Sequence, residues 1–474
     1  MRRLVILVIL ALIPLLAPAQ NRSGMGEIRE LWDNDCASCH GADLSGGMAT
    51  SLLDDEWLNG GSDEELAASI RDGMPDAGMP GWSEALDENQ IRALVILIRE
   101  VRMQSGLEAL RKNLEGDVVT AAGHAYRLEE IAEFDGILWS IAFLPNESML
   151  VTQRDGILWH FENGQRTRIK GTPEVWQHGQ GGLLEVAVHP AYKDNGWIYL
   201  SYSENSGARE NGSDAGMTAV VRGKIEGAQW VAQETLFRVD EKHHTSTRVH
   251  FGSRFVFNDG YLYFGIGDRG RKERSQNLDR PNGKIFRIHD DGRVPQDNPF
   301  VDTRGALPEI WSYGHRNPQG MDLDPSTGLL WEAEHGPRGG DEINLVEKGK
   351  NYGWPVITYG MNYDGTPITS ETHREGMEQP RLHWTPSIAV AGIDFYEGNA
   401  FPSWKGKLLA GGLASEELHL LTIEDGRVTA DEIILKDRGR IRDVASGPDG
   451  AVYLLLTGGS PRKGRIVKML PADG

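Results

Sequence analysis

Two cysteines and a histidine stand close enough together to hold a redox group. The only cysteines of the chain are Cys36 and Cys39, and His40 follows directly in the run Cys-Ala-Ser-Cys-His. This is the C-x-x-C-H pattern of covalent c-type haem attachment, in which both thiols bind the porphyrin and the histidine binds iron. The alternative is a disulfide beside an unrelated histidine, and the adjacent His40 favours haem c.

A methionine segment offers the second axial ligand to such an iron. Residues 73–82 contain Met74-Pro and Met79-Pro, and Met/His ligation is found in electron-transferring cytochromes c. The surrounding region resembles a small class I cytochrome c, a family whose axial methionine lies in a Met-Pro element before the last helix. That resemblance favours Met79 as the iron ligand, whereas Met74 is interpreted as a packing residue.

Helices are needed to position these ligands, and the sequence predicts two helix starts. Ser62 followed by Glu65, and Asp87 followed by Gln90, have the spacing of capping boxes. Apolar residues then recur at helical spacing after Asp87, at Ile91, Leu94, Val95, Ile98 and Val101. We therefore expect a small all-α cytochrome c domain over residues 20–104.

The first residues have the features of an export signal. Two arginines precede an apolar stretch over residues 4–16, and a small-x-small site follows at residues 17–19. A retained membrane anchor is the alternative, but the stretch is short and Pro14 interrupts it. We expect a signal peptide over residues 1–19 and a periplasmic mature protein without a membrane span.

The amino-acid composition limits the kinds of molecule that the protein is expected to bind. The 474 residues include 49 basic and 69 acidic side chains, for a net charge of −20, and no basic run occurs. Nucleic-acid binding is therefore not expected. The 58 glycines and 22 prolines are typical of many short strands joined by tight turns.

Beyond residue 128, a pattern of two apolar strands and a turn occurs six times. The copies contain Ile141, Val186, Phe255, Met321, Ile393 and Val444 at equivalent positions. Their spacing of 45 to 72 residues fits four-stranded blades of about 40–50 residues with insertions. The repeats predict an all-β six-bladed β-propeller over residues 128–474, after a linker at 105–127. A β-sandwich is the alternative, but six repeats are too many for one.

Polar and glycine-rich segments lie at the ends of these repeated strands, so a propeller would gather them on one face. They are residues 180–182, 250–254, 267–270, 314–319, 334–341, 411–413 and 440–443. Glycines let a backbone approach a ligand closely, and paired arginines suit an anionic ligand. The alternative interpretation is turn chemistry at the ends of blades.

From about residue 130 onward, the chain resembles the PQQ-dependent soluble aldose sugar dehydrogenases of the glucose/sorbosone dehydrogenase family. The motifs that carry the resemblance are residues 176–184, 250–254, 309–320, 334–344, 350–355 and 440–443. The resemblance implies a six-bladed propeller that binds pyrroloquinoline quinone (PQQ) and Ca²⁺ at one end of its axis. The cytochrome lies outside it as a fused partner.

The resemblance also implies a role for each matching residue. His250 would be the catalytic base that takes the proton of the substrate hydroxyl. If it is not, His315 is the next candidate because it adjoins Arg316. Arg316 and Asn317 would contact the quinone carbonyls, and Arg316 would stabilise the developing negative charge. Further cofactor contacts would come from Gln180, Tyr363, Arg440 and Arg442.

Two calcium sites are implied in the same way. The backbone carbonyls of Gly336 and Pro337 would hold the calcium beside the quinone, and Glu342 and Tyr352 would form a structural site. In one departure from glucose-oxidising relatives, Ala414 replaces a lysine, so one cationic contact to the quinone is missing.

The expected function is oxidation of an aldose sugar or related alcohol to the lactone or acid. Hydride would pass to PQQ, and electrons would then reach the fused haem and a periplasmic or membrane acceptor. The alternative function is a calcium-dependent lactonase or a non-catalytic carbohydrate-binding propeller on a cytochrome. The arginine pair at 440 and 442 favours the dehydrogenase, because a lactonase needs no pair of arginines for a polycarboxylate.

Overall fold

A computed structural model describes residues 24–54, 57–114, 116–459 and 462–472. The predicted signal peptide lies outside the described residues. Among those that are described, no helix combines the length and apolar character needed to cross a membrane.

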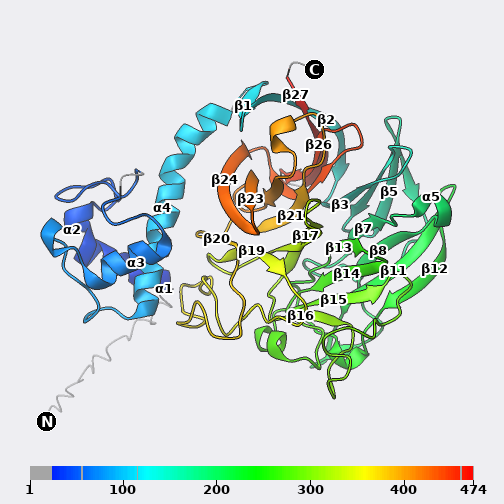
Figure 1. Cartoon of the computed structure of the whole chain (residues 1–474), viewed down its shortest axis with the longest axis horizontal. Coiled ribbons are helices and arrows are strands. Elements are labelled where there is room, and N and C mark those ends of the chain that lie inside the picture. The colour runs from blue at the N-terminus through cyan, green and yellow to red at the C-terminus, as the bar shows by residue number, and fades with distance from the viewer. Residues whose placement is uncertain (1–23, 55–56, 115, 460–461, 473–474) are drawn as a thin grey trace, which may run out of the picture.

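The N-terminal region is a small helical domain that lies beside a larger ring of sheets, with α4 running between the two (Figure 1). Its elements are α1 (Gly24–Leu31), the π-helix η1 (Trp32–Cys36), α2 (Ala37–His40), α3 (Asp63–Asp72), the 3₁₀ turn η2 (Pro75–Ala77) and α4 (Glu88–Leu114).

Both predicted capping boxes are confirmed. Ser62 Oγ accepts the Glu65 backbone N–H at 3.2 Å, and the Glu65 carboxylate accepts the Ser62 N–H at 2.9 Å. At the start of α4, Asp87 Oδ1 accepts the Gln90 N–H at 2.9 Å, and Gln90 Oε1 accepts the Asp87 N–H at 3.0 Å. Each box satisfies two groups that a helix terminus leaves unpaired.

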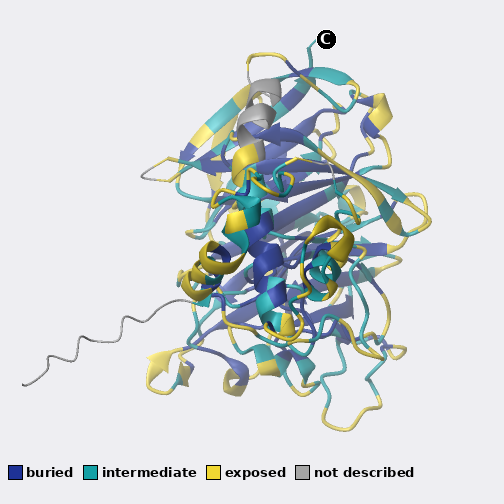
Figure 2. Ribbon diagram, turned by 90° about the vertical axis from the view of Figure 1, so that its left-hand side faces the viewer, coloured by how far each residue is buried: buried dark blue, intermediate teal, exposed yellow. Residues whose placement is uncertain are grey.

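The predicted apolar face of α4 forms the core of the helical domain. Ile91, Leu94, Val95 and Ile98 are all at most 4% exposed, and the central turns of α4 are buried (Figure 2). They pack with Trp32 and residues of α1 and α3.

The second region is a six-bladed propeller. Blade one contains β3–β6 (Leu138–Phe143, Met149–Gln153, Ile157–Glu162, Gln165–Ile169). Blade two contains β7, β8, β11 and β12 (Leu183–Val188, Ile198–Glu204, Met217–Glu226, Gln229–Phe237). Blade three contains β13–β16 (Phe255–Asn258, Tyr261–Ile266, Lys284–His289, Ile310–Tyr313). Blades four and five are β17–β20 (Pro318–Leu323, Leu330–Glu334, Asp341–Val346, Leu382–Trp384) and β21–β24 (Val390–Phe395, Leu408–Gly412, Glu417–Glu424, Arg427–Lys436).

The sixth blade joins both ends of the propeller sequence. It contains β25 (Arg440–Ser446), β26 (Val452–Gly458), β27 (Lys463–Pro471), β2 (His124–Asp135) and β1 (Val119–Ala121). Strand β2 pairs antiparallel with β27, from Tyr126 opposite Pro471 to Asp135 opposite Lys463. The residues expected to be a linker therefore carry the end of α4 and the first strands of this sheet.

The loops between the strands contain several short elements. They are the hairpin β9 and β10 (Arg209–Glu210, Ser213–Asp214), α5 (Tyr192–Asn195), and the 3₁₀ turns η3 (Glu241–His243), η4 (Lys272–Gln276) and η5 (Pro402–Trp404).

The innermost strands form a closed ring. Strands β3, β7, β13, β17, β21 and β25 each contact the next, and β25 contacts β3. All six repeats predicted from the sequence supply one of these inner strands, so the six-bladed architecture is confirmed. Apolar side chains fill the space between neighbouring sheets, as in the cluster of Leu409, Leu420, Ile441 and Leu454.

Candidate active site and haem centre

His250 lies just before the inner strand β13 and is held from two sides. Its Nδ1 lies 2.6 Å from Asp268 Oδ1, and its backbone N–H donates to Gln180 Oε1 at 2.8 Å. The φ angle of His250 is 55°, a left-handed conformation that is uncommon outside glycine and that the surrounding contacts must maintain. The imidazole is 14% exposed, so it retains access to a ligand.

Asp268 is the residue that orients this histidine. It is 1% exposed, and it also accepts hydrogen bonds from Trp354 Nε1 at 2.8 Å and from the Gly270 N–H at 2.7 Å. Burial alone would raise its pKa, but its interactions with His250, Arg316 and Trp354 outweigh burial and lower it. An ionised Asp268 favours the tautomer with hydrogen on Nδ1, which leaves Nε2 as a proton acceptor.

Asp268 was not among the predicted site residues. The signal for it was its position in the polar run 267–270, directly after β14. Its contact with His250 depends on the pairing of β13 with β14, which brings the start of one strand beside the end of the other.

The electrostatic surroundings keep His250 neutral. Burial, followed by the positive charge of Arg316, lowers its pKa below the ordinary value, although Asp268 acts in the opposite direction. A neutral imidazole at neutral pH is the form that can accept a proton.

Arg316 and Asn317 lie at the start of the next inner strand, β17. One Arg316 Nη donates to the carbonyl of His335 at 2.8 Å, and the guanidinium lies 5.4 Å from the centre of the Trp354 ring. Asn317 is 1% exposed and accepts the Gly252 N–H at 3.2 Å. These contacts bring the segments around 250, 316 and 335 together.

Several polar atoms in this group have no partner of their own. Buried atoms without a hydrogen bond include Arg316 Nε, His335 Nε2 and Arg442 Nε. The pKa of His335 lies well below its ordinary value because of burial and the charges of Arg442 and Arg316. Unpaired buried donors carry a desolvation cost that an anionic ligand would offset.

Arg440 and Arg442 on β25 supply the cationic side of the group. An Nη of Arg442 donates to Gln319 Oε1 at 2.9 Å, and burial with the nearby Arg254 and Arg440 lowers the pKa of Arg442 to about 9. By contrast, Arg254 is paired with Glu185 at 2.9 Å and Asp443 at 2.8 Å. Arg440 and Arg442 fit a ligand with several carboxylates.

Tyr363 is not brought into this group. Its side chain is 72% exposed, on the long connection between β19 and β20. Its backbone carbonyl accepts a bond from Arg338 at 3.4 Å. Among the described residues, no hydrogen bond joins Tyr363 to His250, Arg316, Arg440 or Arg442.

Gly336 and Pro337 form a tight turn directly after His335. The Gly336 N–H donates to Asp341 Oδ1 at 2.7 Å, and a Cβ at Gly336 would lie 2.2 Å from the Gly340 carbonyl carbon. Glycine is therefore required for this close approach. Burial raises the pKa of Asp341 to about 6. Among the described residues, neither the Gly336 nor the Pro337 carbonyl accepts a hydrogen bond, which fits oxygen ligation of calcium.

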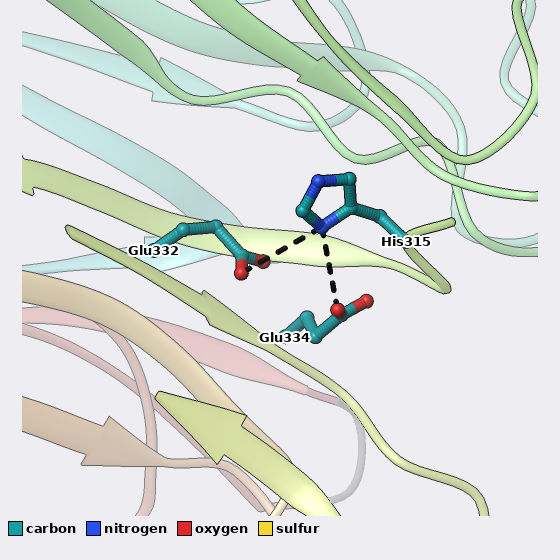
Figure 3. A group of neighbouring side chains, drawn as sticks. All are labelled: His315, Glu332 and Glu334. Carbon is teal, nitrogen blue, oxygen red and sulfur yellow. Dashed lines mark ion pairs between the residues drawn. The ribbon is translucent and has the colours of Figure 1, made fainter. Parts of the chain in front are cut away.

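A second group that could hold a cation lies inside the propeller (Figure 3). The ligating atoms of His315, Glu332 and Glu334 lie within 4.8 Å of one another, and all three residues are buried. His315 Nδ1 points between the carboxylates, at 3.9 Å from Glu332 and 3.4 Å from Glu334, without a hydrogen bond. Its Nε2 lies 2.9 Å from Ser312 Oγ.

This group adjoins the residues predicted for a structural calcium. The Tyr352 ring stacks on His315 at 4.5 Å, and Asn344 Nδ2 donates to both Glu332 and Glu342 at 3.2 Å. The Tyr352 hydroxyl donates to the carbonyl of Leu345 at 2.6 Å. The phenol is thus already bonded, whereas His315 Nδ1, Glu332 Oε1 and Asn344 Oδ1 are buried without a hydrogen-bond partner. The sequence had not indicated these three residues as ligands.

The haem-attachment residues lie together at the end of η1 and in α2. Cys36 and Cys39 are half-buried and form no disulfide, and His40 Nδ1 is buried without a hydrogen-bond partner. Met79 packs against the same apolar cluster as Cys36. Met74 and Met79 are joined by backbone hydrogen bonds of 2.9 and 3.1 Å, which close the turn between them. These residues fit a covalent haem with His40 and Met79 as ligands.

Comparisons with known proteins match both regions. Residues 136–468 match the Glucose / Sorbosone dehydrogenase family, and residues 24–98 match the family of cytochrome C oxidase, cbb3-type, subunit III. The chain is 44% identical over 344 residues to aldose sugar dehydrogenase YliI of Escherichia coli, covering 71% of this chain and 90% of that protein.

Solved structures agree. The apo-form of the soluble aldose sugar dehydrogenase from Escherichia coli superposes with a TM-score of 0.69 at 42% identity, covering 73% of this chain and 99% of that one. The PQQ-bound aldose sugar dehydrogenase from Streptomyces coelicolor gives a TM-score of 0.58 at 26% identity, covering 73% and 98%.

Proposed function

Because the chain belongs to the glucose/sorbosone dehydrogenase family and carries an N-terminal cytochrome c domain, we propose that it is a quinohaemoprotein sugar dehydrogenase. It oxidises an aldose or a related alcohol to the lactone at PQQ and passes the electrons to its own haem. The observation that carries this proposal is the hydrogen-bonded His250–Asp268 pair beside the buried Arg316 and Arg442, whose Nε atoms have no hydrogen-bond partner.

His250 acts as the general base. Its Nε2 accepts the proton of the substrate hydroxyl, while the hydrogen bond from Nδ1 to Asp268 holds the ring and stabilises the imidazolium that forms. When bound, the quinone would supply the two-electron acceptor for the hydride from the substrate carbon that bears this hydroxyl. Arg316, whose charge acts on His250, and the neighbouring Asn317 provide hydrogen-bond donors for the negative charge that would develop on the quinone.

The arginines and the calcium hold the cofactor. Arg440 and Arg442 bind its carboxylates, Gln180 contributes from the segment that also fixes His250, and the carbonyls of Gly336 and Pro337 bind the calcium. Ala414 is exposed at the end of β22, so no cation stands where relatives have lysine, and the arginines carry the electrostatic attraction. A structural cation is bound near Glu342 and Tyr352, and Tyr363 lines the outer rim of the site.

The proposal also covers the location of the protein and the fate of its electrons. The protein is a periplasmic enzyme whose signal peptide is removed, and the haem passes electrons to a periplasmic or membrane acceptor. Sequential transfer through the haem fits a reduced quinone that holds two electrons and a haem that carries one.

The test is anaerobic mixing of the haem-loaded protein with PQQ, Ca²⁺ and a panel of aldoses. The haem absorption band should shift to the reduced form only when sugar, quinone and calcium are all present. A protein that hydrolyses lactones and never reduces its haem would establish the lactonase function instead.

A further inference from the structure

Side chains of α4 contact the propeller. The carboxylate of Glu100 on α4 receives two hydrogen bonds from Arg338, from Nε at 2.8 Å and from Nη2 at 2.7 Å. The two side chains are 23% and 25% exposed. A bidentate pair of this kind fixes direction as well as distance.

Further contacts surround this ion pair. Arg92, two turns earlier on α4, donates to the carbonyls of Thr369 at 2.9 Å and Ser370 at 2.8 Å. Met361 of the propeller is 2% exposed and belongs to the apolar core of the helical domain. The backbone of Met361 pairs with that of Arg338 at 2.9 and 3.0 Å. The interface is thus built from polar and apolar contacts on both sides.

The position of Arg338 in the chain gives the contact its significance. Arg338 follows Gly336 and Pro337 directly, and the carbonyl of His335 accepts the hydrogen bond of Arg316. One four-residue segment, 335–338, therefore touches the candidate active site at one end and α4 at the other.

We propose that segment 335–338, through the Arg338–Glu100 pair, is the docking contact that sets electron transfer from the active site to the haem. The inference rests on the proposed function. Two electrons leave the reduced quinone one at a time for the ferric haem, and two protons are released. An external one-electron acceptor reoxidises the haem between the two transfers.

The test follows quinone and haem reduction separately by stopped-flow spectroscopy in the full-length protein loaded with haem, PQQ and Ca²⁺. The variants are Glu100→Arg, Arg338→Glu and the double exchange. The matched control is Arg293→Glu, which breaks an ion pair with Asp291 at 2.7 Å on blade three. Each single exchange places like charges together, which costs binding energy at an interface.

We expect haem reduction to slow at least about tenfold in both single variants, while sugar reduces the quinone at the unchanged rate. The double exchange should recover most of the loss, and the control should behave as wild type. Added salt should slow haem reduction in the wild type, because it screens a partly exposed pair.

Unchanged haem reduction in Glu100→Arg, or a double exchange no faster than the single variants, overturns the inference. If no sugar reduces the quinone in the wild type, the proposed function fails instead. The docking contact is then judged by hydrogen exchange, where Glu100→Arg should speed exchange of the α4 amides between residues 92 and 100. Unaltered protection there also overturns it.

Discussion

At the scale of single residues, a carboxylate decides what His250 can do. Asp268 fixes the ring, stays ionised because of its hydrogen bonds, and leaves one nitrogen of His250 free to accept a proton. Burial is the main cause that lowers the pKa of His250, and the positive charge of Arg316 adds to it. The orientation of the His250 ring and its ability to accept a proton therefore both depend on the 2.6 Å hydrogen bond to Asp268.

Replacing His250 with alanine should lower kcat by about 10²–10⁴-fold, the usual contribution of a general base. Quinone binding should persist, because the arginines that hold the cofactor lie on other strands. Single-turnover reduction of the bound quinone by excess aldose measures the effect, with His160→Ala on β5 as the control. A variant that reduces its quinone at the wild-type rate would mean that another group is the base.

Asp268→Asn should leave the ring in place but lose the tautomer preference, so kcat should fall while KM changes little. The asparagine still occupies the site between Trp354 and Gly270. Steady-state kinetics with an artificial acceptor separate the two parameters. An unchanged kcat would show that Asp268 is only a packing partner.

Only one of the two neighbouring methionines, Met74 and Met79, is expected to bind the haem iron. Met79→Ala should lower the reduction potential of the haem, because methionine ligation raises it, whereas Met74→Ala should leave the potential near wild type. Spectroelectrochemical titration of each variant measures this. The reverse pattern would assign the ligand to Met74.

At the scale of elements, local signals were sufficient for some features and not for others. The capping boxes at Ser62 and Asp87 and the inner strands of the six blades could be predicted because each depends on residues close in sequence. The cluster of His315, Glu332 and Glu334 could not, because it requires the exact register of β18 beside the segment before β17. Tyr363 was assigned to the site by a motif match alone, and its side chain is 72% exposed in the structure, so its role as a cofactor contact stays a prediction.

A histidine between strands β23 and β24 should make the folded protein less stable at alkaline pH. Burial alone would lower the pKa of His419, but its hydrogen bonds with Asp431 and Glu417 outweigh burial and raise the pKa to about 9. A group with a raised pKa contributes its stabilisation below about pH 6.5 and loses it as pH rises through about 9. The contribution amounts to about 3 kcal/mol.

The unfolding free energy of the wild type should therefore fall between pH 6 and pH 10 by about 3 kcal/mol more than that of His419→Gln. Urea denaturation of both proteins at the two pH values measures the difference. Equal losses in the two proteins would mean that His419 is not charged in the folded state.

At the scale of the whole molecule, the ring closes by pairing strands from opposite ends of the propeller sequence. Strand β2 completes the sheet of β25–β27, and its Tyr126 and Phe134 are at most 3% exposed. The family match begins only at residue 136, so this strand lies outside it. Removing β2 would leave β27 with an unpaired edge.

A fragment that begins at residue 116 should fold and bind quinone, whereas one that begins at residue 137 should aggregate or unfold at a lower temperature. The first keeps the closing strand and lacks only the helical domain. Thermal unfolding monitored by circular dichroism compares them. Equal stability of the two fragments would show that the ring closes without β2.

The pairing of β2 with β27 also fixes an order of events during synthesis. The haem-attachment cysteines leave the ribosome about 430 residues before the end of β27, which is roughly 20 to 90 s at ~5–20 residues per second. Throughout that interval the propeller cannot close, and the loop carbonyls that receive Arg92 come late in the chain. Cys36, Cys39 and His40 are consequently synthesised well before the surface on which the helical domain finally rests has formed.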